Sequence, residues 1–199
     1  MRVIAGSFRG RKLKSPASFE TRPTSDRLRE TLFNVIAPHI EGARFLDLCA
    51  GAGAVGIEAI SRGAAYVTFV DRSRQMGRLI KANLDLCRVG VDEFELVIME
   101  AGDFLRRRLK RKGEPWTVVF FDPPYAEDYL RVLKLFGKDA NELMNEDGLL
   151  VVEHHHKNDL PEAVGGLRRC RVLKQGESAL SFYERAEDGA EEISSAQLD

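Results

Sequence analysis

Short apolar runs and helical stretches alternate through the middle of the chain. The apolar runs lie near residues 44–48, 66–70, 94–99, 117–121 and 148–154, and the helical stretches lie near 53–62, 73–87, 104–112 and 128–144. Parallel strands need long crossover connections, usually helices, so this alternation predicts a parallel sheet with helices on both faces. Two later runs, Arg171 to Lys174 and Ala179 to Glu184, predict a hairpin and therefore an antiparallel strand at one edge. The expected fold class is α/β, with a doubly wound, mostly parallel seven-stranded sheet.

The region before the first of these strands predicts a small β-hairpin and one helix. Gly6 and Gly10 separate two short basic runs, as in a hairpin. The helix follows Pro23, with Thr24 or Ser25 as its cap and Pro38 at its end. Its apolar face has members at i, i+4, i+7 and i+8: Leu28, Leu32, Val35 and Ile36. Such a hairpin is expected to be too small to supply a core, so that removal of residues 2–14 would leave the rest folded.

Acidic residues stand at the ends of three successive predicted strands. Asp47 precedes the glycine-rich turn Cys49 to Gly56, Asp71 ends the second strand, and Asp103 follows the third. Ligands of open α/β sheets bind at the carboxyl ends of the strands, and glycines let the backbone approach a ligand closely. Asp71 is spaced to accept hydrogen bonds from ribose hydroxyls. Asp103 could accept from an adenine amino group beside the ring of Phe104.

The tetrapeptide Asp122-Pro123-Pro124-Tyr125 follows the apolar run Val118 to Phe121. By itself it fits an ordinary turn as well as a site for methylating an exocyclic amino group of a nucleobase. The lone pair of such a nitrogen is delocalised into the ring, and acceptors aimed at the amino hydrogens can localise it. The prolines stiffen the turn and present carbonyl oxygens, and the tyrosine can stack on a flipped base.

With these motifs in this order, the chain resembles the class I S-adenosylmethionine-dependent methyltransferases, in their amino-methylating branch. The blocks Met1 to Leu13 and Thr21 to Asn34 narrow the resemblance to the RsmD type of 16S ribosomal RNA guanine-N2 methyltransferase, and it extends to about Arg185. The resemblance implies a Rossmann-like fold and methyl transfer to the N2 amino group of one guanine in small-subunit RNA. It also implies S-adenosyl-L-methionine as the cofactor.

The motifs and the resemblance together assign three sets of residues. The catalytic set is Asp122, Pro123, Pro124 and Tyr125. The cofactor-binding set is Asp47, Cys49, Ala50, Gly51, Gly53, Asp71, Arg72, Gly102, Asp103 and Phe104. The set for substrate RNA is Arg9, Arg11, Lys12, Arg22 and Thr24. No metal is expected, because the sulfonium cofactor carries its own activation.

Charge is distributed unevenly along the chain although the formal net charge is −1. Residues 1–30 carry eight basic and three acidic side chains, whereas the segment after Arg185 carries five acidic ones. Lysine and arginine supply the phosphate contacts of nucleic-acid binding, so the basic segment is the expected RNA-facing element. We expect a basic hairpin extension over 1–22, a methyltransferase domain over 23–185, and an acidic disordered tail over 186–199.

Several other features have an ambiguous meaning in the sequence. The basic run from Arg106 to Lys112 fits a solvated helix better than an auxiliary RNA contact. The three histidines His154 to His156 would alternate between the faces of a strand and so disfavour a metal site. Asn83 lies on the apolar face of its helix and is expected to be a buried hydrogen-bonding residue, and Glu58 could pair with an amino-terminal arginine.

Cys49, Cys87 and Cys170 form no disulfide or zinc pattern, and neither a signal peptide nor a membrane span is evident. We therefore expect a cytoplasmic monomer that acts on 16S RNA or the assembling 30S subunit. Two alternatives stay open. One is a DNA methyltransferase acting on adenine N6 or cytosine N4, which the absence of a target-recognition domain disfavours. The other is a ribosome-assembly factor that binds RNA without turnover.

Overall fold

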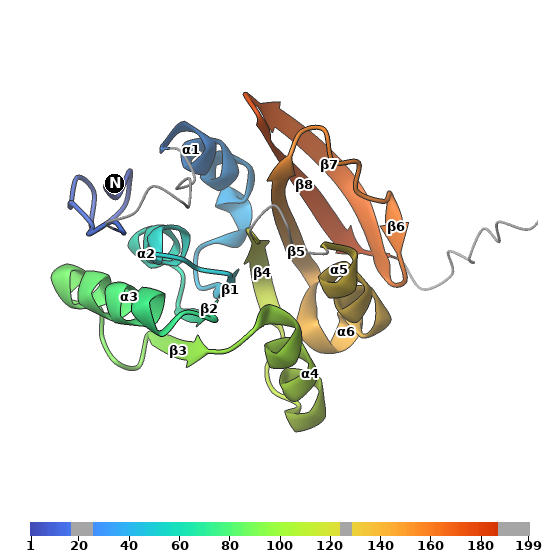
Figure 1. Ribbon diagram of the computed structural model, residues 1–199, viewed down its shortest axis with the longest axis horizontal. Coiled ribbons are helices and arrows are strands. Elements are labelled where there is room, and N and C mark those ends of the chain that lie inside the picture. Colours follow the sequence, from blue (N-terminus) through green and yellow to red (C-terminus); the bar gives the residue numbers. More distant parts are fainter. Residues whose placement is uncertain (17–25, 124–128, 187–199) are drawn as a thin grey trace, which may run out of the picture.

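In a computed structural model, the described part of the protein comprises residues 1–16, 26–123 and 129–186. The predicted alternation is confirmed (Figure 1). The strands are β1 Arg44–Leu48, β2 Tyr66–Asp71, β3 Phe94–Ile98, β4 Trp116–Phe121, β5 Met144–His155, β6 Ala163–Val164, β7 Leu167–Gln175 and β8 Ser178–Arg185. The α-helices are α1 Asp26–Val35, α2 Ala54–Ser61, α3 Arg74–Cys87, α4 Ala101–Arg111, α5 Tyr129–Lys138 and α6 Ala140–Leu143.

The strands of the described residues form one sheet in the order β3-β2-β1-β4-β5-β8-β7-β6. The first five run parallel, and β8 is antiparallel to both β5 and β7. The α/β class and the mostly parallel sheet are therefore confirmed. The sheet has eight strands instead of seven because the two-residue strand β6 pairs with β7. The predicted hairpin is confirmed as the antiparallel pair β7 and β8, in which β8 lies between β5 and β7.

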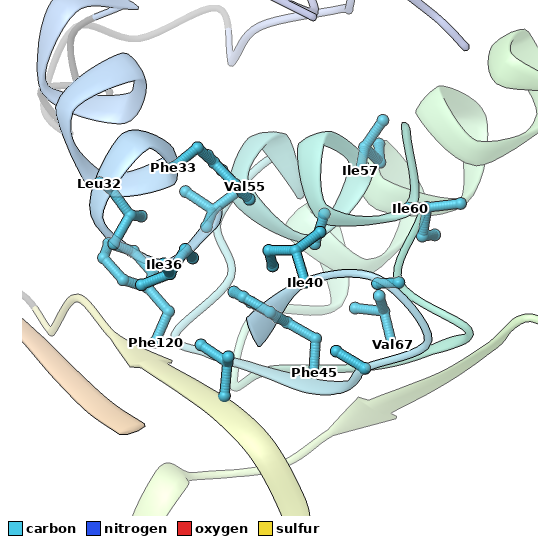
Figure 2. Close-up of a cluster of buried hydrophobic side chains, with 14 of the residues drawn as sticks. Leu32, Phe33, Ile36, Ile40, Phe45, Val55, Ile57, Ile60, Val67 and Phe120 are labelled. Atoms are coloured by element: carbon cyan, nitrogen blue, oxygen red, sulfur yellow. The ribbon is translucent and has the colours of Figure 1, made fainter. Parts of the chain in front are cut away.

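Alternate residues of the central strand build two separate cores. Phe45 faces the core formed with α1, α2 and α3, whereas Leu46 and Leu48 face the core formed with α4, α5 and α6. This follows from the two-residue period of a strand. Figure 2 shows the first core, in which Leu32, Phe33 and other apolar side chains converge. Both faces of the sheet are thus covered, and only the strand ends remain for a site.

The predicted helix near 128–144 is two helices, since α5 ends at Lys138 and α6 begins at Ala140. The predicted apolar face of α1 is confirmed in part. Leu28 and Leu32 are buried, Ile36 just beyond the helix is fully buried, and Val35 is half-buried. The expected cap of α1 lies outside the described residues. Among the described residues, no helix has the length and apolar content to cross a bilayer.

The amino-terminal segment is joined to the rest more closely than expected. Its two arms meet in a single antiparallel bridge between Arg2 and Lys12. Val3 and Leu13 are 1% and 6% exposed and belong to the same core as α1 and α2. The segment therefore adds one buried side chain from each arm to the core of the main domain, and Met1 and Phe8 pack against that core. That the rest folds without this segment stays a prediction.

Candidate functional site at the strand ends

The register of the central strands places two of the predicted acids beside the glycine-rich turn. Leu48, the last residue of β1, pairs with Val70 of β2 and with Phe121 of β4. The residues that follow are therefore neighbours: Cys49, Asp71 and Asp122. The amide of Cys49 donates to the Val70 carbonyl at 2.9 Å, and the amide of Asp122 donates to the Leu48 carbonyl at 3.3 Å. The order of the strands reverses at β1, which is the switch point where α/β sheets bind ligands.

The turn after β1 has an unusual backbone. Cys49, Gly51 and Gly53 have φ of 68°, 55° and 78°. Glycine adopts this left-handed region at little cost, but a cysteine there is strained. Strain of this kind concentrates at functional sites and persists only where neighbouring contacts hold it. The turn therefore has a backbone shape suited to close contact with a ligand.

Asp71 holds this turn in place. One carboxylate oxygen accepts from the Gly51 amide at 2.9 Å, and the other accepts from the Ser73 amide at 2.8 Å. Each oxygen keeps a second lone pair that could accept from a ligand. Partial burial raises the pKa of Asp71, although the two amides oppose that shift. A carboxylate kept in such a place is stabilised by a ligand that donates hydrogen bonds or carries positive charge.

Asp47 is buried under the turn instead of lying at its surface. It is 2% exposed and accepts from the Gly56 amide at 2.8 Å. Desolvation raises its pKa to about 7, with the nearby charge of Asp71 as a further contribution. Gly56 lies so close to Phe69 that a Cβ would fall 2.2 Å from the ring. Asp47 therefore fixes the start of α2 against β2 and supports the turn from below.

The remaining predicted cofactor residues fall into different environments. Ala50 donates to the Val70 carbonyl, and Arg72 forms an ion pair of 3.3 Å with Glu100. Gly102 and Asp103 lie in the first turn of α4, where the exposed Asp103 carboxylate pairs with Arg106. Phe104 is 7% exposed and packs on Trp116, with ring centroids 5.8 Å apart. The ring of Phe104 is thus part of the core and not beside Asp103 at the surface.

Of the predicted catalytic group, Asp122 is half-buried and Pro123 is buried. Pro124 and Tyr125 lie outside the described residues, as do Arg22 and Thr24 of the predicted RNA-binding set and the acidic tail beyond residue 186.

Glu58 holds the amino-terminal segment, a role that its position in the sequence only suggested. Its side chain is fully buried in α2 and accepts from the amides of Ile4 and Ala5 at 2.8 and 2.9 Å. It also pairs with Arg62 at 2.8 Å and with the fully buried Arg29 at 3.8 Å. The expected partner from the amino-terminal region is therefore confirmed as Arg29. The two backbone amides could not be foreseen, since a main-chain donor carries no sequence signal.

The predicted role of Asn83 as a buried hydrogen-bonding residue is confirmed. It is 0% exposed, and its amide exchanges hydrogen bonds with the backbone of Lys14 at 2.8 and 3.1 Å. It also donates to the carbonyl of Ala52, inside the glycine-rich turn, at 2.9 Å. Asn83 therefore joins the amino-terminal segment to the candidate site.

The cations Arg9, Arg11 and Lys12 are exposed but do not lie beside Asp122. The Phe8 amide donates to the hydroxyl of Ser61, the last residue of α2, and Arg11 donates to the carbonyl of Leu86 near the end of α3. Both helices begin at the strand ends and run away from them. The tip of the hairpin therefore lies toward the opposite edge of the sheet, whereas Lys14 is joined to the turn through Asn83.

The three histidines at the end of β5 do not converge. His154 is buried and hydrogen-bonds to the Ser181 hydroxyl at 2.8 Å, whereas His155 and His156 stack on each other outside the core. Within residues 1–16, 26–123 and 129–186 no cluster of potential metal ligands occurs.

Comparisons with known proteins agree with this geometry. A family model described as "Conserved hypothetical protein 95" matches residues 1–184. The Ribosomal RNA small subunit methyltransferase D of Escherichia coli (strain K12) is 37% identical over 189 residues, covering 95% of this chain and 92% of the relative. The YlbH protein of Bacillus subtilis (strain 168) is 39% identical over 185 residues, covering 93% and 99%. The solved structure of yhhF from Escherichia coli superposes with a TM-score of 0.80 at 34% identity, covering 94% and 98%.

Proposed function

The chain belongs to the Conserved hypothetical protein 95 family, the family of the RsmD-type methyltransferases, and from this premise we propose that it methylates small-subunit ribosomal RNA with S-adenosyl-L-methionine. The finer proposal is that the acceptor is the exocyclic N2 amino group of a guanine. The observation that carries it is the placement of Asp71 and Asp122 on the two sides of the Cys49 turn.

The residues at the strand ends fit this cofactor. Gly51 and Gly53 give the turn a backbone that a ligand can approach, and Asp71 has lone pairs for ribose hydroxyls. The raised pKa of the half-buried Asp71 indicates a carboxylate that a cationic ligand would stabilise. Asp103, which is exposed in the first turn of α4, is the candidate acceptor for an adenine amino group. Its ion pair with Arg106 would have to break for Asp103 to accept that hydrogen bond.

When bound, S-adenosyl-L-methionine supplies a methyl group on a sulfonium sulfur, and the amino nitrogen of the base takes it up as the sulfur–carbon bond breaks. The chain's own part is to prepare that nitrogen. Asp122 and the carbonyl oxygen of Pro123 accept the amino hydrogens, which holds the lone pair out of the ring system. Preorganised acceptors of this kind stabilise the positive charge that develops on the nitrogen during transfer. Tyr125 would stack on the flipped base with about 1–3 kcal/mol of stabilisation.

The test is transfer of a labelled methyl group from S-adenosyl-L-methionine to 16S RNA and to 30S particles that lack the modification, with the methylated nucleotide mapped. Wild type should label one guanine at N2. Asp122→Ala should bind the cofactor with unchanged affinity by calorimetry and lose transfer by at least a hundredfold, roughly the loss on removing one preorganised partner. Asp147→Ala, an exposed position at the start of β5, is the matched control.

Three results would contradict the proposal. Wild-type turnover by Asp122→Ala would make the tetrapeptide a structural turn. Labelling of DNA adenine or cytosine instead of RNA would move the enzyme to the alternative substrate class, and binding of RNA without any transfer would make it an assembly factor.

A further inference from the structure

The basic run on α4 is divided by the fold into two groups of side chains. Three of its cations are used within the protein. Arg106 pairs with Asp103, Arg108 lies over the Trp116 ring at 5.1 Å from its centroid and donates to the Glu114 carbonyl at 2.7 Å, and Lys112 pairs with Glu142 at 3.8 Å. Three others have no ion pair or side-chain hydrogen bond to any described residue: Arg107, Lys110 and Arg111. Positions i, i+3 and i+4 share one face of a helix, so these three form an exposed stripe.

A second stripe of cations lies on the neighbouring helix. α5 packs against α4, and its exposed face carries Arg131, Lys134 and Lys138 at i, i+3 and i+7. These cations likewise have no ion pair to a described residue. The Arg131 guanidinium reaches the first turn of α4, where its Nε lies 3.7 Å from the position that a Cβ on Gly102 would take. The two stripes lie on neighbouring helices that cover the same face of the sheet, and we call them together the α4–α5 basic surface.

This surface begins at the candidate site. α4 starts three residues after the end of β3, and α5 starts six residues after Pro123, so that both helices have their first turns near the carboxyl ends of the strands (Figure 1). From Arg131 to Lys138 the α5 stripe extends about 10 Å along its helix, at 1.5 Å per residue. The amino-terminal segment packs on α2 and α3, which cover the other face of the sheet. The amino-terminal cations and the α4–α5 basic surface therefore lie on opposite faces of the sheet.

We infer that the α4–α5 basic surface binds the phosphate backbone of the substrate RNA. The inference rests on the proposed function for its choice of partner. Six cations without internal countercharges repel one another, and a polyanion that passes across them removes that repulsion and releases its own condensed cations. Two acidic side chains on or beside these helices, Asp103 and Glu142, are already paired with Arg106 and Lys112. Contacts to the backbone hold the RNA in place without reading its sequence.

The test compares two triple variants with a control of equal charge. One variant is Arg107→Gln, Lys110→Gln and Arg111→Gln, and the other is Arg131→Gln, Lys134→Gln and Lys138→Gln. The control is Arg168→Gln, Arg171→Gln and Lys174→Gln, which removes three exposed cations from β7. Affinity for transcribed 16S RNA is measured at several salt concentrations, with methyl transfer and cofactor affinity measured beside it.

Each α4–α5 variant should lower the slope of log affinity against log salt by about two to three, since each lost phosphate contact removes about 0.7–0.9. The KM for RNA should rise, and kcat at saturating RNA and the affinity for S-adenosyl-L-methionine should stay at the wild-type value. The control should keep the wild-type slope. Wild-type slopes in both α4–α5 variants, or an equal loss in the control, would overturn the inference while leaving methyl transfer intact. Absence of RNA methylation by wild type would instead contradict the proposed function.

Discussion

The side-chain amide of Asn83 accepts a hydrogen bond from the Lys14 amide and donates to the Lys14 carbonyl. It also donates to the carbonyl of Ala52. One buried side chain of α3 thereby joins the amino-terminal segment to the glycine-rich turn. The two parts are 38 residues apart in the chain and share no other side chain of this kind among the described contacts. A change in the position of one part is therefore transmitted to the other.

Asn83→Ala should weaken cofactor binding and destabilise the fold. Three partly buried backbone groups would lose their partners, and a fully buried group left without a partner costs about 1–3 kcal/mol, so the loss per group lies at or below the lower end of that range. Denaturant unfolding and calorimetry with S-adenosyl-L-methionine measure the two effects. Lys81→Ala, an exposed residue on the same helix, is the control. Loss of stability with wild-type cofactor affinity would show that Asn83 serves the fold alone.

Glu58→Ala should destabilise the protein by about 3–5 kcal/mol, the range for removing one partner of a buried ion pair. Its loss leaves Arg29 as a buried cation with Asp26 as its remaining countercharge, and leaves the amides of Ile4 and Ala5 without acceptors. Unfolding in urea measures the change. The double variant Glu58→Leu with Arg29→Met should recover part of the stability. A loss under 1 kcal/mol in the single variant would contradict this account.

Asp47 should make stability fall between about pH 4 and pH 7. Its pKa is about 7 in the folded protein and near 3.8 when unfolded, so the folded state binds the extra proton in that interval. Stability is then highest at the acidic end and decreases as the pH rises through the folded pKa, by an amount on the order of 4 kcal/mol for this group. Asp47→Asn should remove this contribution, which urea unfolding at a series of pH values would show. Asp147→Asn should retain the wild-type curve, and an unchanged curve in Asp47→Asn would refute the assignment.

Asp71→Ala should weaken binding of S-adenosyl-L-methionine by more than tenfold, because the turn loses its anchor at Gly51 and the ligand loses an acceptor. Asp71→Asn keeps one acceptor oxygen, so its affinity for S-adenosyl-L-methionine should lie between those of the wild type and of Asp71→Ala. Calorimetry gives the affinities, and circular dichroism should show an unaltered fold. Equal affinities in all three proteins would remove Asp71 from the cofactor site.

Arg9→Gln with Lys12→Gln should reduce RNA affinity and lower its salt slope by about 1.4–1.8, if the amino-terminal cations contact phosphates. Arg11 is left intact, because its guanidinium donates to the Leu86 carbonyl and lies 5.8 Å from the Phe8 ring centroid. Cofactor affinity should not change. A wild-type slope would leave the α4–α5 basic surface as the principal RNA contact.

Local patterns in the sequence were sufficient for the fold class and for the location of the site. Alternation of apolar and helical periods predicts a parallel sheet, and residues that follow strands must lie at its carboxyl edge. The tetrapeptide at 122–125 and the turn at 49–56 were found in this way. Errors arose where a pattern is too short to be seen. The two-residue strand β6 and the break between α5 and α6 depend on packing, and propensity does not determine them.

The sequence alone determined which residues end the strands, because strand periodicity and glycine chemistry act over a few neighbouring residues. Only the tertiary structure decided which of those ends are neighbours, since the pairing of β1 with β2 and β4 brings Asp71 and Asp122 to the two sides of Cys49. It also decided which charges are buried and paired, such as Glu58, and which are left at the surface, such as Arg107. Burial and pairing depend on contacts between distant segments, and a linear pattern does not contain those contacts.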